Sequence, residues 1–429
     1  MTQTRDGYRS YEIYQRERVG ESTPLLKARQ LRSSEFAADP YPLLSILREN
    51  YPCYRDWHGN AFWLTRYDDV TSVFVDDANF ATRSKRWHYG RPEFGRDMRG
   101  ELAVLVAEAA GIDRHALPLT AEVVARLAAD AHVGNTVDLA VEVGARLPVR
   151  LLARVLGLPD TDVPWFASQY WKMQRGVGWN PAARQAGLAA MDNLCTYFSP
   201  LLVARGNEPT DDLLSAFAGL ELADGPITAH DVVATLLEGD HETLHGALAS
   251  LLFRIVTEPA IQAQVREDPR FVTLAYLEVL RHSPPTIAAH RYSRHEVERF
   301  GRLLPEGCLV ICSAAAAGRD PRAFPTDPEA FVVDRRDMCH REPRGQYRAD
   351  GLPTGIAFGL GRPSRFPALP EDRPRSRYAI TRDTAAAIVV ALLDAFASFA
   401  LADAATPKQS SPRPGATYTC WSLPTKLRL

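Results

Sequence analysis

The segment from Thr228 to Pro259 carries the longest helical pattern in the chain and constrains the fold more than any other stretch. Its apolar residues recur every three or four positions and cover much of the helix circumference, which is typical of a buried helix. Thr228 followed by Asp231 forms an N-cap pattern. The middle of the segment, EGDHETLH, is polar. Because buried polar groups need hydrogen-bond partners or a cavity, the segment predicts a central helix with polar surroundings at its middle.

The remaining patterns predict helices through the middle of the chain and short strands near both ends of that region. Helical spacing extends from about residue 100 to 290, and a last helix is expected at about 379–398. Residues 55–66, RDWHGNAFWLTR, have a turn between two strand-like segments and predict a hairpin. Residues 286–335 alternate short apolar runs with Gly and Pro turns. The expected fold class is therefore mainly α with a small β region.

Composition and charge exclude several kinds of function. The 429 residues carry a net charge of -2, which gives no basic excess for nucleic acid. No run of 18 apolar residues is long enough to span a membrane, and the polar N-terminus lacks a signal-peptide pattern. Six scattered cysteines form no disulfide framework, so a cytoplasmic location is expected. Cys308 and Cys312 lie on one strand face with no second pair or nearby histidine, so we interpret them as buried residues, and no metal site is expected.

Four separated stretches, in the same order and at similar spacing, resemble bacterial cytochrome P-450 proteins. They are DPYPLLSILRENYPCYRDWHGNAFWLTRYDDVTSVFVDDANF near the N-terminus, HETLHGALASLL in the central helix, LEVLRHSPPTIAAHR, and GRDPRAFPTDPEAFVVDRRD. Together they cover about residues 36–400. The resemblance implies a P-450-like fold with one domain over residues 31–429, preceded by a polar arm over residues 1–30.

The resemblance also assigns roles to individual residues. Glu278 and Arg281, three apart on a helix, match the family's E-x-x-R pair, and Arg335 matches the arginine that joins them in a buried structural network. A solvated surface pair is the alternative. Glu242 and Thr243 match the acid–alcohol pair that relays protons in the family. We interpret this pair as vestigial, because its neighbours depart from the family pattern and the haem ligand is missing.

That missing ligand is the decisive departure. The family's loop reads F-x-x-G-x-x-x-C-x-G, and its cysteine thiolate binds the haem iron. Here Phe358 and Gly361 match the first positions, while Arg365 stands at the cysteine position. If the alignment is anchored on the last helix instead, the cysteine position falls on Arg375. Either residue is an arginine, which has no lone pair to offer iron.

Other haem contacts are only partly kept. Residues 355–380 contain no Cys or His, which leaves Tyr378 as the one residue of a type known to ligate haem. The family usually has a His and an Arg four apart on an early helix for a haem propionate. The corresponding positions here are Asp113 and Leu117, although Arg291 matches the later propionate-binding arginine. These departures predict that no cofactor is held and that no residue is catalytic.

The resemblance therefore extends to haem-free P-450 homologues. One such group contains the auxiliary proteins of actinomycete antibiotic glycosyltransferases. This implies a protein that binds, stabilises and activates a deoxysugar glycosyltransferase in macrolide- or anthracycline-type biosynthesis, as a hetero-oligomer and without nucleic-acid or membrane partners. A partner that binds only the competent state of an enzyme raises the population of that state. Two alternatives remain open: a haem-independent enzyme that uses the vacated pocket, and a P-450 monooxygenase with atypical haem ligation.

Overall fold

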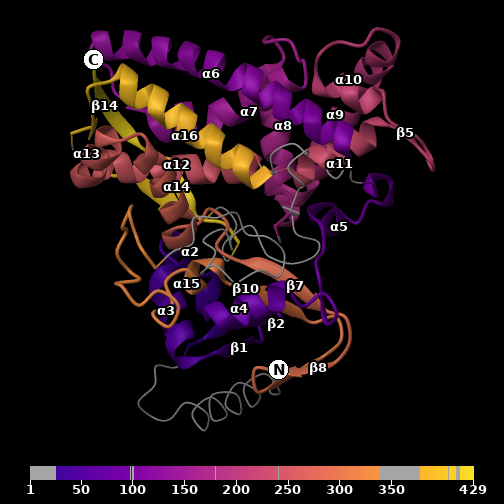
Figure 1. The fold of residues 1–429 in the computed structure, drawn as a ribbon. Coiled ribbons are helices and arrows are strands. Elements are labelled where there is room, and N and C mark those ends of the chain that lie inside the picture. The colour runs from indigo at the N-terminus through magenta and orange to yellow at the C-terminus, as the bar shows by residue number, and fades with distance from the viewer. Residues whose placement is uncertain are drawn as a thin grey trace.

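The computed structural model describes residues 26–96, 98, 101–178, 180–239, 241–337, 377–403, 405–411 and 416–429. A helix-rich part lies above a smaller part that contains the largest sheet (Figure 1). The helices are η1 Ala28–Arg32, α2 Ser34–Ala38, α3 Tyr41–Asn50, α4 Tyr67–Phe74, α5 Lys85–Tyr89, η2 Pro92–Phe94, α6 Leu102–His132, the π-helix η4 Ala140–Arg146, α7 Leu147–Val155, α8 Val163–Arg175, α9 Pro181–Asn207, α10 Leu213–Ala218, α11 Ala229–Glu238, α12 His241–Thr257, α13 Pro259–Glu267, α14 Arg270–His282, α15 Ala314–Ala317 and α16 Arg377–Ala395.

The strands form one larger sheet and several small ones. They are β1 Cys53–Asp56, β2 Ala61–Leu64, β3 Phe80–Ala81, β4 Val137–Asp138, β5 Glu221–Leu222, β6 Gly225–Pro226, β7 Ala289–Ser293, β8 Val297–Arg299, β9 Arg302–Leu304, β10 Leu309–Cys312, β11 Ser398–Leu401, β12 Lys408–Ser410, β13 Thr419–Ser422 and β14 Pro424–Arg428. The larger sheet has the order β1-β2-β10-β7-β3. Only the β2–β10 pair is parallel, with Leu309 opposite Ala61. The mainly helical class with a small β region is confirmed.

The hairpin predicted at residues 55–66 is the β1–β2 pair. The two strands are antiparallel, with Cys53 opposite Leu64 and Asp56 opposite Ala61. Asn60 ends the turn at φ 47°, in the left-handed region that asparagine tolerates better than most residues. All four residues of β2 are buried, because this strand lies between β1 and β10 inside the sheet.

The core lies where α12 passes between η4, α7, α14 and α16. Residues on α12 such as Leu248 and Leu251 are completely buried. The π-helix η4 approaches α12 closely, since a Cβ on Gly144 would lie 3.0 Å from the Cβ of Ala249. A second cluster, which includes Leu47 and Trp63, packs the N-terminal helices against the sheet. Burial on all sides of α12 agrees with its nearly continuous apolar pattern.

One element differs from the sequence prediction. The central segment does not form a single helix, because α11 ends at Glu238 and α12 begins at His241. Thr228 does cap α11, and its backbone N–H donates to the Asp231 carboxylate at 2.8 Å. Pro259 ends α12 as expected, and a new helix, α13, begins there. The apolar period continues through the break, so periodicity alone could not reveal it.

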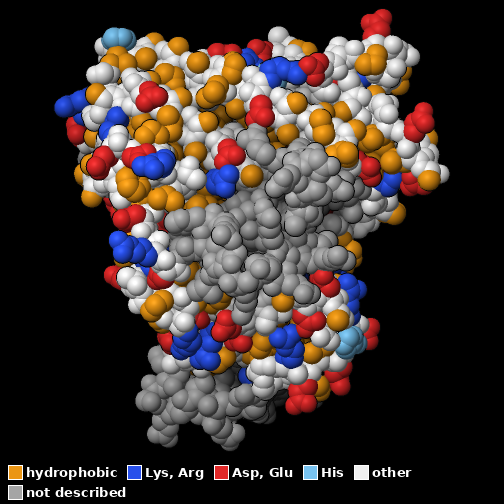
Figure 2. Space-filling view, in the orientation of Figure 1, with side chains coloured by type: hydrophobic (Ala, Val, Ile, Leu, Met, Phe, Trp, Pro, Cys, Tyr) orange, Lys and Arg blue, Asp and Glu red, His pale blue; other side chains and the backbone are white. Residues whose placement is uncertain are grey.

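No single helix in the described ranges is both long and apolar enough to cross a membrane, although α12 and α13 satisfy the length and composition test together despite a bend of 106°. Figure 2 shows hydrophobic, acidic and basic side chains interspersed over the described part of one face. Cys312 is buried on β10 as predicted, whereas Cys308 lies one residue before the strand and is only half-buried, so the prediction is wrong for Cys308. Among the described residues, no group of His, Cys, Asp or Glu side chains could hold a metal ion.

Candidate functional site

The break between α11 and α12 is held by side chains from two other helices. Gly239 is extended (φ -62°, ψ 162°) and cannot continue the helix. The buried Gln174 amide of α8 donates to the carbonyls of Leu236 (3.3 Å) and Leu237 (3.1 Å), which a continuous helix would satisfy itself. Lys85 of α5 donates to the Gln174 oxygen at 2.9 Å. The carbonyls at the end of α11 therefore have hydrogen-bond partners despite the break.

Glu242 and Thr243 lie in the first turn of α12, directly after this break. Their side chains are outside the described part of the chain, so their assignment as an acid–alcohol pair stays a prediction. The next polar residue, His245, is buried with its ring centroid 5.0 Å from that of Trp171 and 4.8 Å from that of Trp421. The start of α12 is thus enclosed by residues of α8 and β13.

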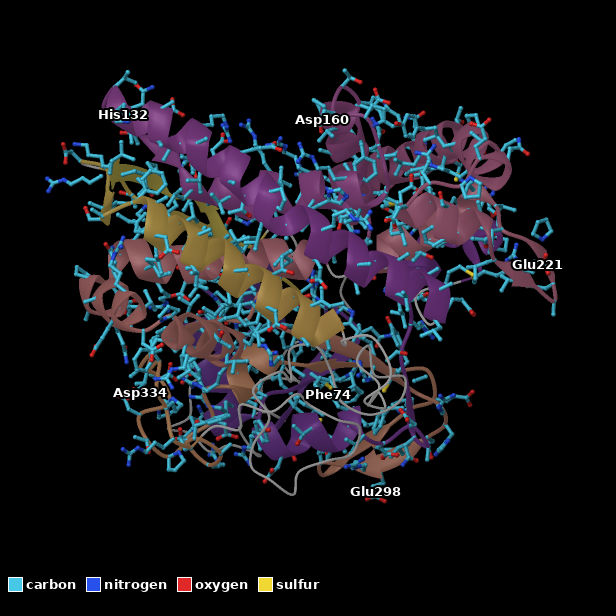
Figure 3. The ribbon with its side chains drawn as sticks, turned by 45° about the horizontal axis from the view of Figure 1, so that its top comes forward. Phe74, His132, Asp160, Glu221, Glu298 and Asp334 are labelled. Carbon is cyan, nitrogen blue, oxygen red and sulfur yellow. The ribbon has the colours of Figure 1, made fainter. Side chains whose placement is uncertain are left out.

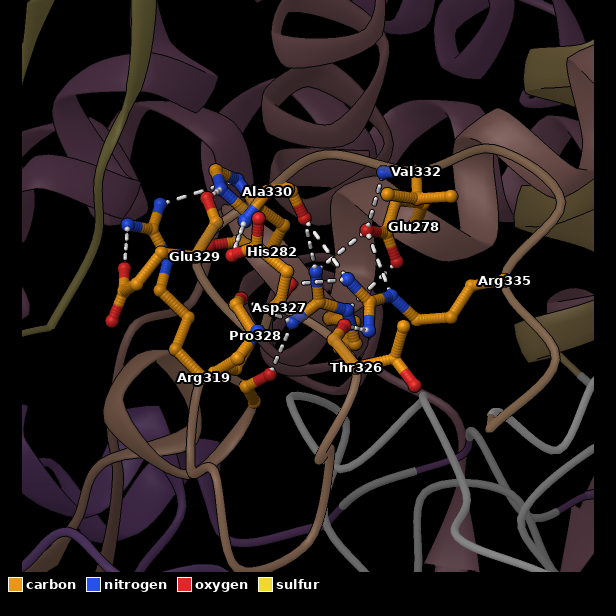
Figure 4. Close-up of polar contacts among 12 residues, drawn as sticks. Glu278, His282, Arg319, Thr326, Asp327, Pro328, Glu329, Ala330, Val332 and Arg335 are labelled. Carbon is orange, nitrogen blue, oxygen red and sulfur yellow. Dashed lines mark hydrogen bonds and ion pairs between the residues drawn. The ribbon is translucent and has the colours of Figure 1, made fainter.

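Glu278, Arg281 and Arg335 meet in a buried ion network (Figure 4). Glu278 and Arg281 lie one turn apart on α14, and both side chains have an exposed fraction of 0%. The Glu278 carboxylate accepts from Arg281 at 2.6 and 2.7 Å, from Arg335 at 3.4 Å and from the backbone N–H of Val332 at 2.9 Å. The two guanidinium groups also donate to the backbone carbonyls of Gly318, Thr326, Asp327, Pro328 and Ala330. Arg335 pairs in addition with the Asp337 carboxylate at 3.2 Å. The network pins the segment after α15 to α14.

A second polar cluster surrounds His282 at the end of α14 (Figure 4). Arg319 and Arg254 donate to its Nδ1 from 3.1 and 3.2 Å, because a guanidinium can only donate. Its Nε2 therefore carries the proton and donates to the Glu329 carbonyl at 2.9 Å. Burial, reinforced by Arg319 and Arg254, lowers the pKa of His282 to about 2. The imidazole is neutral and its tautomer is set by its neighbours.

Arg291 places a positive charge on the larger sheet, on β7 and opposite Val310 of β10. Its guanidinium lies 4.6 Å from the ring centroid of Phe74, and its Nη1 donates to the His290 carbonyl at 3.0 Å. Phe74 is at the end of α4, in the sheet-containing part of the molecule (Figure 3). Burial raises the pKa of the Cys312 thiol to about 12, and Arg291 opposes that shift. The Arg291 charge thus lies beside the Phe74 ring and acts on the Cys312 thiol.

The positions aligned with the early propionate-binding pair lie on the outer face of α6. The Leu117 side chain is 55% exposed, and Asp113 is exposed as well. Arg114 pairs with Asp211 and donates to its backbone carbonyl at 2.8 Å. Burial lowers the pKa of the adjacent His115. In this register these positions face outwards and cannot contact a group in the interior.

The positions of the iron-ligand loop lie outside the described residues. These are Phe358, Gly361 and Arg365, together with the alternative position Arg375. Tyr378 is in the first turn of α16, and its side chain is likewise not described. The alignment of these residues with the family's iron-ligand loop therefore rests on the sequence alone.

Comparison with known proteins relates this architecture to one superfamily. No family model matches the chain. Vitamin D(3) 25-hydroxylase of Pseudonocardia autotrophica is 29% identical over 357 residues, which cover 77% of this chain and 85% of that protein. A cytochrome P450 monooxygenase of Streptomyces venezuelae is 27% identical over 379 residues, covering 80% and 84%. The solved structure of the bacillaene polyketide synthase cytochrome P450 of Bacillus subtilis superposes with a TM-score of 0.73 at 20% identity, covering 93% of this chain and 99% of that one.

The chain is thus similar over more than three quarters of its length to a cytochrome P450 monooxygenase and to a hydroxylase. Its P450-like fold, expected from four sequence stretches, is confirmed by the structural match. The prediction of a chain without haem is contradicted, because relatives that match along more than three quarters of this chain are named cytochromes, which are haem proteins. That prediction depended on one short loop and on two propionate-binding positions. Nor do the relatives support the prediction of a non-catalytic protein, since they are named as a hydroxylase and a monooxygenase.

The donor chemistry of this chain fits haem only in part. Arg291 can pair with a propionate, as a guanidinium binds carboxylates well. The loop that carries the thiolate in cytochromes P450 does not fit, because residues 355–380 contain neither Cys nor His. Tyr378 is the residue there whose side chain, as a tyrosinate, ligates iron in another haem class.

Sequence reasoning missed the residues that act across helices. Gln174, Lys85 and His282 carried no motif, and their roles follow from partners far away in the sequence. The polar middle of the central segment predicted polar surroundings there, but nothing in the sequence indicated that Gln174 of α8 bonds the backbone carbonyls of Leu236 and Leu237 just before it.

Proposed function

We propose that the chain is a P450-type oxidoreductase of natural-product biosynthesis whose haem is not ligated by a cysteine of residues 355–380. The observation that supports this is the match to a hydroxylase and a monooxygenase over 77% and 80% of the chain. The fold match to a cytochrome P450 of a polyketide synthase supports the natural-product context. Haem, when bound, would supply oxygen activation.

The chain's own residues have distinct proposed tasks. Arg291 holds a propionate by charge, with its guanidinium kept in place by Phe74 and the His290 carbonyl. Glu242 and Thr243 hold and pass a proton at the start of α12. Gln174 keeps the break before them open by occupying the freed α11 carbonyls.

The test is an absorption spectrum of the protein purified after expression with a haem precursor. A stoichiometric Soret band is expected. Tyr378→Phe should shift that band if the tyrosine ligates iron, and Arg291→Ala should weaken haem retention without unfolding the protein. A preparation that folds and shows no Soret band refutes the proposal.

A second candidate function is supported by a separate observation, the lack of Cys and His in residues 355–380. We propose as the alternative that the chain binds and activates a deoxysugar glycosyltransferase of macrolide- or anthracycline-type biosynthesis. A partner that binds the competent state of the transferase would stabilise it by about 2.7 kcal/mol at a hundredfold excess over the dissociation constant.

One double variant separates the two candidates. The chain is co-expressed with a deoxysugar glycosyltransferase, and co-elution and sugar transfer are measured. Glu242→Gln combined with Thr243→Ala should abolish oxidation of the natural-product substrate if the first proposal holds. The same double variant should leave activation of the transferase intact if the second holds. Absence of both a complex and an effect on sugar transfer rejects the auxiliary role.

A further inference from the structure

The long helix α6 presents an apolar face to solvent, where a surface helix normally carries polar and charged residues. Its inner face packs against α7, α10 and α16, and Figure 1 shows it along the top edge of the molecule. On the outer face, Leu102, Val106 and Leu117 are 55%, 49% and 55% exposed. The other exposed residues as far as residue 125 are Ala103, Ala110, Asp113, Arg114, Pro118, Ala121, Glu122 and Ala125. A contiguous apolar surface of this kind marks an interaction site.

This face is complementary to itself when a second α6 runs in the opposite direction. With the midpoint between Asp113 and Arg114, each of these residues faces the opposite charge on the other copy. The same register places Leu102 opposite Ala125, Val106 opposite Ala121 and Leu117 opposite Ala110. Each large side chain therefore meets an alanine, which lets the two helices interdigitate. A two-fold axis generates every such pair twice.

The geometry and size of the face agree with a weak pair of crossed helices. Its apolar residues follow mostly steps of four, and such rows run at about 26° to the helix axis, so the two helices cross obliquely. At 1.5 Å per residue the stretch Leu102–Ala125 is roughly 35 Å long, and with a width of about 10 Å it covers on the order of 400 Å² per chain. A standard interface buries about 800 Å² per partner, so the pair should dissociate on dilution.

We propose that the protein forms a homodimer through the outer face of α6, with the two helices antiparallel and the two-fold axis beside Asp113 and Arg114. A second copy is the partner that this face fits, because both its charges and its large and small residues are matched by its own reversed sequence. Arg114 also binds Asp211, and its five N–H donors leave room for a second carboxylate. The inference is independent of either proposed function, since it depends only on the surface of α6.

The experiment measures the oligomeric state of the full chain by sedimentation velocity at concentrations from about 1 to about 200 µM. The wild type should change from monomer to dimer over this range. Asp113→Arg and Arg114→Asp each place like charges opposite one another, so each variant alone should dimerise about tenfold more weakly or worse. An equimolar mixture of the two variants restores opposite charges across the axis. It should form a heterodimer whose affinity is within about threefold of the wild-type value.

A second pair of variants tests the apolar part of the face. Leu117→Arg places a charge against Ala110 and should abolish the dimer, whereas Val203→Arg, at a 66% exposed position on α9, is the matched control and should leave it unchanged. Because all four substituted positions are exposed, circular dichroism should show wild-type folding for each variant. A wild-type chain that stays monomeric at about 200 µM overturns the proposal and leaves the face to a different partner. A dimer that Asp113→Arg and Leu117→Arg do not weaken, or a mixture that recovers no heterodimer, overturns it as well.

Discussion

Glu278→Ala tests the buried network most directly. The substitution removes a carboxylate that accepts four hydrogen bonds. It leaves Arg281, 0% exposed, without its carboxylate partner, whereas Arg335, 1% exposed, keeps Asp337. Breaking one member of a buried ion network costs about 3–5 kcal/mol. At ~2.1 cal/mol/K per residue, the 429-residue chain has an unfolding entropy of roughly 0.9 kcal/mol/K, so the melting temperature should fall by about 3–6 °C.

The assay is thermal unfolding followed by circular dichroism, with two matched variants. Glu278→Gln keeps the shape of the side chain without its charge. Its melting temperature should lie between those of the wild type and the alanine variant. Asp403→Ala removes a carboxylate that is 88% exposed and pairs with Lys426, so it should change stability by less than about 1 kcal/mol. If Glu278→Ala melts within a degree of Asp403→Ala, the network does not stabilise the fold as argued.

Three further predictions follow from other contacts. The pKa of His282 is about 2 in the folded chain and about 6.5 in the unfolded chain. The contribution of the neutral imidazole to the free energy of unfolding is therefore fully present above pH 6.5 and declines as the pH falls below that value. Between pH 7.5 and 5 the wild type should lose about 2 kcal/mol for this reason, and His282→Gln should flatten that slope in urea titrations. Gly318→Ala should destabilise by about 1–3 kcal/mol or more, because its Cβ would lie 2.1 Å from the Arg281 backbone carbonyl; denaturation midpoints measure this. Gln174→Leu should cost about 1–3 kcal/mol by removing the donor to the Leu237 carbonyl, while the Leu236 carbonyl keeps the Gly239 N–H, and an unchanged midpoint would contradict that role.

Local patterns predicted those elements whose causes are local. The hairpin over residues 55–66 follows from alternation around a turn, and the cap at Thr228 follows from an acid three residues later. The grouping of Glu278 with Arg281 is also local, because residues three apart share a helix face. Arg335 joined them only through the family resemblance, since 54 residues separate it from Arg281.

The loop at residues 355–380 shows how a local signal can mislead. The absence of Cys and His there is a fact of the sequence, and it predicted a chain without haem. Relatives along more than three quarters of the chain contradict that conclusion. The sequence of this loop concerns one ligand of the iron, whereas the alignment with the relatives extends over the helices and the sheet that position the rest of the site.

By itself, the sequence determined the mainly helical class, the order of the elements, the hairpin and the helix cap, because propensity and periodicity act over a few residues. Only the tertiary structure decided that the central segment breaks at Gly239, since the Gln174 and Lys85 side chains that support the break come from residues 62 or more positions away. It likewise decided the neutral tautomer of His282, which two distant arginines and a carbonyl impose. Hydrogen bonds and burial between remote segments exist only after the chain has folded, and no local pattern encodes them.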